Sequence, residues 1–69
     1  MSKTAQALEK ITKDMRMHIE VLKNDYGRNP EDRDTVRARA ASYVQGLCDA
    51  GAVTVTEKRV LFSYVTLGR

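Results

Sequence analysis

The stretch that decides the fold runs from Tyr43 to Leu67 and reads YVQGLCDAGAVTVTEKRVLFSYVTL. Its first residues continue an upstream helix, which Gly51 is expected to end because glycine readily adopts the left-handed conformation that follows a helix. The remainder is rich in β-branched and aromatic residues, which favour strands. We therefore expect a β-hairpin over residues 52–67, with its turn near Lys58.

The second strand of this hairpin is expected to be apolar on both faces. With alternating side chains, one face carries Val60, Phe62, Tyr64 and Thr66, and the other carries Leu61, Ser63, Val65 and Leu67. Two helices of one protomer can cover only one face, and an isolated two-stranded hairpin is marginally stable. The sequence therefore predicts an intertwined or sheet-paired homodimer, with Phe62 and Tyr64 at the shared interface.

Upstream, the spacing of apolar residues predicts two helices. Over residues 4–26 they recur every three or four positions, which gives one apolar stripe: Leu8, Ile11, Met15, Ile19, Leu22 and Tyr26. Gly27 and Pro30 interrupt the pattern. A second helix over residues 30–50 has its own stripe, made of Val36, Ala40, Tyr43, Val44 and Leu47. The expected fold is α+β, one domain over residues 1–69, with two antiparallel helices followed by the hairpin.

Composition narrows the possible functions. The 69 residues include one cysteine and one histidine, which permit no intrachain disulfide and no standard structural zinc site. Neither a glycine-rich phosphate loop nor a plausible pair of catalytic carboxylates is present, so we expect a non-enzyme with no cofactor, no metal and no evident small-molecule substrate. No apolar run is long enough to span a membrane, and we expect a cytoplasmic protein.

Two groups of small or apolar residues lie outside the predicted core stripes. Met17 and Val21 are four residues apart on the far side of the first helix. They are either isolated surface residues or a patch that faces a partner. Ala38 and Ala41 lie on the outer face of the second helix, where they either favour the helix or allow close approach of another chain. We name these four residues as candidate interface residues.

Part of the chain resembles a known family. Residues 47–53 (LCDAGAV), followed by residues 62–67 (FSYVTL), resemble the passage from a winged-helix recognition helix into its wing, and residues 34–39 (DTVRAR) resemble the start of that helix. The resemblance covers residues 34–67 and implies DNA binding. The chain departs from the family in lacking a separate short helix before the recognition helix, and its exposed helix face is rich in Ala, Ser, Gln and Asp rather than basic.

Five basic side chains are the candidate DNA contacts: Arg33, Arg37 and Arg39 on the second helix, and Lys58 and Arg59 at the hairpin tip. Together with a net charge of +3 they predict a surface that binds phosphates. The alternative for these residues is a solvated charged surface, because acidic residues at positions 31, 32 and 34 are interleaved with the arginines.

Two function hypotheses follow from the sequence. The first is a small DNA-binding regulator that uses a winged-helix-like surface. The second is a small inhibitor or adaptor that docks on a larger cellular protein through its apolar and small-residue helix faces.

Overall fold

The computed structural model of the protein describes residues 2–68 and contains four α-helices in that range, with no β-strand. In chain order the elements are α1 (Lys3–Lys10), α2 (Lys13–Arg28), the short 3₁₀ helix η1 (Pro30–Asp32), α3 (Arg33–Asp49) and α4 (Val55–Leu67). The fold is therefore all-α, and the expected α+β class is wrong.

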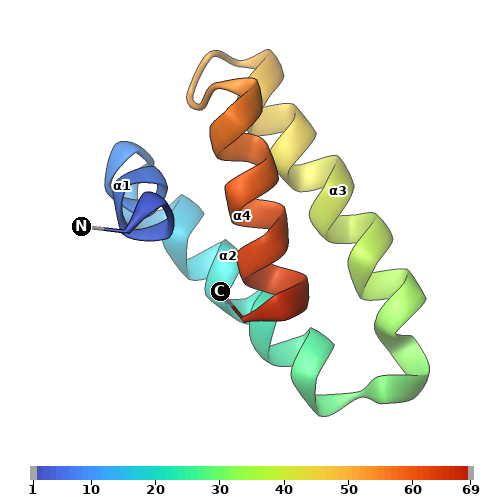
Figure 1. The fold of residues 1–69 in the computed structure, drawn as a ribbon. Coiled ribbons are helices and arrows are strands. Elements are labelled where there is room, and N and C mark those ends of the chain that lie inside the picture. Colours follow the sequence, from blue (N-terminus) through green and yellow to red (C-terminus); the bar gives the residue numbers. More distant parts are fainter. Residues whose placement is uncertain (1, 69) are drawn as a thin grey trace.

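Helix α4 forms the centre of the molecule. It packs against α1, α2 and α3, and in Figure 1 it lies between α1 and α3 and crosses in front of α2. Leu61 and Val65 point into the core and are fully buried, while Val60, Phe62 and Tyr64 are partly buried around them. A helix surrounded on three sides needs apolar residues over most of its circumference.

That surrounding explains why the hairpin prediction is wrong. The apolar residues of 59–67 satisfy an alternating pattern, but they equally cover three sides of a helix. The helix begins with a capping box, in which the Thr54 hydroxyl accepts from the Glu57 N–H at 3.1 Å and the Thr54 N–H donates to Glu57 Oε1 at 2.7 Å. This local start signal and the tertiary contacts outweigh the strand preference of the β-branched residues.

The predicted first helix is two helices. Its apolar stripe is interrupted at Ile11, which is extended and buried between α1 and α2. Thr12 then caps α2, because its side-chain oxygen accepts from the Met15 N–H at 3.2 Å. The break turns α1 onto α4, so a chain of this size covers the central helix without a partner.

Helices α2 and α3 are antiparallel neighbours joined by η1. Helix α2 continues through Gly27 to Arg28, and α3 ends before Gly51, whose φ of 79° is the left-handed conformation expected there. The core between them contains the residues of both predicted stripes, among them Ile19, Leu22, Val36, Ala40, Val44 and Leu47. None of the helices within residues 2–68 has both the length and the apolar character needed to cross a bilayer.

Two expectations that depended on the hairpin, the wing and the sheet-paired dimer, lose their basis as well. Residues 52–67 form a loop and α4, so the winged-helix resemblance has no wing in this structure. The argument for a sheet-paired dimer, which rested on a strand apolar on both faces, no longer applies, because α1, α2 and α3 of the same chain cover α4.

Candidate functional site

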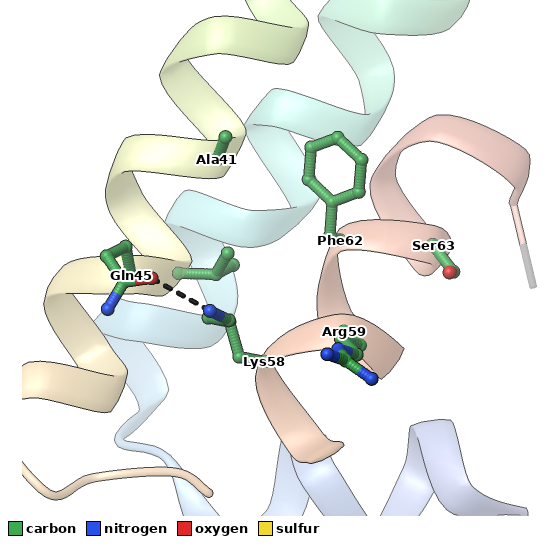
Figure 2. Close-up of a pocket in the computed structure, with 7 residues that line it drawn as sticks. Ala41, Gln45, Lys58, Arg59, Phe62 and Ser63 are labelled. Carbon is green, nitrogen blue, oxygen red and sulfur yellow. Dashed lines mark hydrogen bonds between the residues drawn. The ribbon is translucent and has the colours of Figure 1, made fainter. Parts of the chain in front are cut away.

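An open groove of about 500 Å³ lies between α3 and α4. We call it the α3–α4 groove; its lining residues are Ala41, Val44, Gln45, Lys58, Arg59, Phe62 and Ser63. Figure 2 shows Phe62 projecting from α4 on the side of the groove where Ala41 lies on α3. Phe62 is only half-buried, because the residue opposite it on α3 is a small, exposed alanine.

The sequence places these side chains by helical spacing. On α4, Lys58 and Phe62 are four residues apart, and so are Arg59 and Ser63. The two residues of each pair therefore lie one turn apart on the same side of the helix. On α3, Ala41 and Gln45 are also four apart, and Ala38 lies one turn before them on the same exposed strip. The short side chains of Ala38 and Ala41 leave this part of the groove open.

One end of the groove is closed by a chain of hydrogen bonds. Lys58 Nζ donates to Gln45 Oε1 at 2.8 Å, and Gln45 Nε2 donates to Asp49 Oδ1 at 2.8 Å (Figure 2 shows the first bond). These bonds hold the Lys58 ammonium across the groove from α4 to α3. The ammonium is bonded to a neutral amide, so its positive charge is not neutralised at that position.

The lining of the α3–α4 groove contains two positive charges, and the Asp49 carboxylate lies beyond the lining, bonded to Gln45. Lys58 and Arg59 both line the groove and no carboxylate does. Within residues 2–68 the Arg59 side chain forms no ion pair or hydrogen bond. Arg59 and Ser63 also line a second, shallower groove of about 330 Å³ between α1 and α4, which adds Lys3. The exposed side of α4 therefore has two grooves, lined in part by cations that form no ion pair within residues 2–68.

Two of the predicted DNA contacts, Arg33 and Arg37, lie at the other end of α3. Both guanidinium groups lie over the ring of Tyr26, at 5.2 and 5.7 Å from its centroid. Arg37 also donates to the Tyr26 hydroxyl at 2.9 Å and to Asp34 at 3.0 Å. The hydrogen bond to Tyr26 raises the pKa of Arg37 above its ordinary value. Arg33 Nε donates to the Tyr26 carbonyl oxygen at 3.1 Å, so both arginines connect α3 to the end of α2.

The five predicted DNA contacts do not form one surface. Arg39 lies on the opposite side of α3 from the α3–α4 groove, where it lines a groove with His18 and Tyr43. Lys58 and Arg59 are adjacent, and they lie in the first turns of α4 rather than at a hairpin tip. The five residues therefore separate into the pair Arg33 and Arg37 at Tyr26, the pair Lys58 and Arg59 on α4, and Arg39 alone.

The six predicted interface residues also separate into groups. Ala38, Ala41 and Phe62 lie at or beside the α3–α4 groove, whereas Met17 and Val21 are each 57% exposed on α2. Tyr64 points inward, where its hydroxyl donates to Glu20 and its ring lies 4.7 Å from Lys23 Nζ. The bond to Glu20, aided by burial, raises the pKa of Tyr64 to about 12.

The remaining chemically reactive residues have structural surroundings. His18 is exposed and stacks on Tyr43, with ring centroids 4.0 Å apart and planes inclined by 12°. Burial raises the pKa of Tyr43, and the Asp14 carboxylate adds to the shift. Cys48 is a half-buried free thiol. In the described part of the chain no three His, Cys, Asp or Glu side chains are grouped as metal ligands.

Gln45 and Ser63 were not predicted as groove residues. For Ser63 the signal is the Thr54-x-x-Glu57 pattern, which marks a helix start and places Arg59, Phe62 and Ser63 on one side of α4. Gln45 lies one turn after Ala41 on the outer face of α3. No protein-family model, curated protein or solved structure matches this chain.

Proposed function

We propose that the protein is a non-enzymatic binding module that docks an acidic amphipathic helix of a larger protein in the α3–α4 groove. The observation that carries the proposal is the half-buried Phe62, which faces small residues and leaves the groove open between two helices. Aromatic side chains of this kind are enriched at protein interfaces because they bury a large area with few rotatable bonds.

The shape of the groove favours a helical partner. Helices α3 and α4, with the small residues Ala38 and Ala41 on one side, form a trough along their common direction, which Gln45 and Lys58 close at one end. An amphipathic helix can place large apolar side chains, three or four residues apart, into such a trough. The volume of about 500 Å³ is in the range of binding clefts, but it is spread along the surface and suits a row of side chains.

The charge of the groove favours an acidic partner. Lys58 and Arg59 line it without a carboxylate, and the chain as a whole has a net charge of +3. An Asp or Glu on the incoming helix can take the place of the neutral Gln45 amide at the Lys58 ammonium, which replaces a hydrogen bond to a neutral acceptor with a hydrogen-bonded ion pair. Complementary charge also speeds association.

A displayed library of helical peptides tests the proposal. Selection on the wild-type protein should enrich peptides with two large apolar residues three or four apart and an adjacent Asp or Glu. Ala41→Trp fills the groove from an exposed position and should weaken these peptides at least about tenfold. Thr35→Trp, on an exposed part of the same helix, is the matched control and should leave binding unchanged. Peptides without this pattern, or equal binding to Ala41→Trp, would rule the proposal out.

DNA binding is a second candidate, favoured by the adjacent cations Lys58 and Arg59 in a groove whose lining includes no carboxylate. A fluorescently labelled DNA duplex should then bind at low salt, weaken steeply as salt rises, and be lost with Lys58→Glu/Arg59→Glu. Phe62→Ser distinguishes the candidates, because it removes the apolar contact for a helix and leaves both cations in place. No duplex binding at micromolar protein and low salt removes this candidate.

A further inference from the structure

We propose that the protein forms a symmetric homodimer through a second surface, on the side of α3 opposite the α3–α4 groove. We call this surface the α2–α3 face; its residues are Met17, Val21 and Asp25 on α2, and Arg39, Ser42 and Tyr43 on α3. The occupant of the face is a second copy of the same chain. This inference does not depend on the proposed function, because the two surfaces share no residue.

The α2–α3 face is apolar in its middle. Met17 and Val21 are large residues, each 57% exposed, and they lie one turn apart on α2. Val21 lines a groove of about 410 Å³ whose opposite wall contains Tyr43. His18 on α2 stacks on the Tyr43 ring of α3, which joins the two walls of the groove. A partner that covers Met17 and Val21 would remove the largest exposed apolar pair of α2 from water.

The charges on this face are self-complementary. Asp25 lines the groove from α2 and Arg39 lines it from α3. Within residues 2–68 neither side chain forms an ion pair. Each face therefore has one carboxylate on one wall and one guanidinium on the other, neither of them in an ion pair. A second copy of the chain can pair with both charges, whereas a uniformly acidic or basic partner can pair with only one.

The symmetry that pairs these charges is simple. A two-fold axis that lies in the interface and runs along the groove places α2 of one copy against α3 of the other at the same height. Asp25 then faces Arg39 of the second copy, and the reverse contact forms on the other side of the axis. Val21 meets the Ser42 and Tyr43 region in the same arrangement, so the apolar middle is covered too.

Charge reversal tests the arrangement by light scattering after size exclusion at about 100 μM protein, a concentration at which even weak dimers with dissociation constants in the micromolar range are populated. Wild type should be a dimer. Asp25→Arg and Arg39→Asp should each be mainly monomeric, with dissociation constants raised at least about a hundredfold, because each replaces two opposite-charge contacts with two like-charge contacts. The matched controls on α1, Glu9→Arg and Lys3→Asp, carry the same charge changes at exposed positions and should stay dimeric.

Mixing the two monomeric variants gives the decisive result. One copy then carries two arginines and the other two aspartates at these positions, so the mixed dimer has two favourable pairs and should form. The double variant Asp25→Arg/Arg39→Asp, which restores both pairs with exchanged positions, should also dimerise and guards against misfolding of a single variant. A monomeric wild type, or a mixture that stays monomeric, would overturn the proposal.

Discussion

Tyr64 on α4 donates a hydrogen bond to the carboxylate of Glu20 on α2, across 44 residues of sequence. The contact fixes the rotation of the central helix about its own axis. With Tyr64 turned inward, Leu61 and Val65 fill the core, and Phe62 and Ser63 are left on the outer side beside α3. The position of the α3–α4 groove is therefore linked to a polar contact on the far side of the same helix.

Tyr64→Phe should destabilise the protein by about 1–2 kcal/mol, because a hydrogen bond to a charged group is lost and the Glu20 carboxylate is left without its donor. Urea unfolding followed by circular dichroism measures the change. Tyr26→Phe is the control: its hydroxyl contact with Arg37 is exposed, and its removal should cost no more than about 0.5 kcal/mol. Equal losses for the two variants would contradict the inward position of Tyr64.

The same contact predicts an alkaline transition. The pKa of Tyr64 is about 12 in the folded protein against about 10 in an unfolded chain, so the folded state holds the phenolic proton more tightly. Its stabilising effect is complete below pH 10 and is lost as pH rises from 10 through 12. Unfolding free energies across this range should fall more steeply for wild type than for Tyr64→Phe. Because the chain has no tryptophan, tyrosinate absorbance can follow the titration directly.

Core truncation distinguishes the helix from the predicted hairpin. Leu61 and Leu67 would share one face of a strand, but in α4 Leu61 is fully buried and Leu67 is 68% exposed. Leu61→Ala should therefore cost about 2–5 kcal/mol, and Leu67→Ala less than about 0.5 kcal/mol, in urea unfolding. Comparable costs at the two positions would contradict the helix.

The capping box makes a further prediction about α4. Thr54→Ala should cost about 1 kcal/mol and Thr54→Ser much less, because serine keeps the capping oxygen. Thr56→Ala, in the same turn but without a capping bond, is the control and should change stability little. Thermal unfolding measures all three, and a loss at position 56 as large as at position 54 would count against the cap.

Glu57 gives the cap an acid-sensitive component. The Thr54 N–H, and then Lys10 at 3.0 Å, hold the pKa of Glu57 below its ordinary value. A lowered pKa in the folded state means that the stabilisation is present above the ordinary pKa of about 4.3 and is lost as pH falls below it. Glu57→Gln should unfold with a weaker pH dependence between pH 5 and pH 3. An unchanged dependence would show that Glu57 is not the group responsible.

The sequence predicted the α2–α3 half of the molecule well. Ile19, Leu22, Val36, Ala40 and Leu47 were expected in the core from their spacing and are buried, since amphipathic helices follow a period that can be counted. The end of α3 before Gly51 is also confirmed. The break at Ile11 was missed because the apolar spacing continues through it, and only the Thr12 cap marks it.

The C-terminal part could not be predicted from residue preferences. Val55, Val60, Val65 and their threonine neighbours favour strands, and the decision for a helix comes from α1, α2 and α3 closing around α4. Phe62 and Ala41 were named as interface residues, but their meeting in one groove depends on α4 being a helix beside α3. A site built from two elements requires both to be assigned correctly.

The most direct test of the groove is a nuclear magnetic resonance titration of the ¹⁵N-labelled protein with the best acidic helical peptide from the display selection. The account predicts saturable shifts of the backbone amides at Ala41, Gln45, Lys58, Phe62 and Ser63, and their loss in Ala41→Trp. Shifts that centre instead on Met17 and Val21, or that persist in Ala41→Trp, would contradict it.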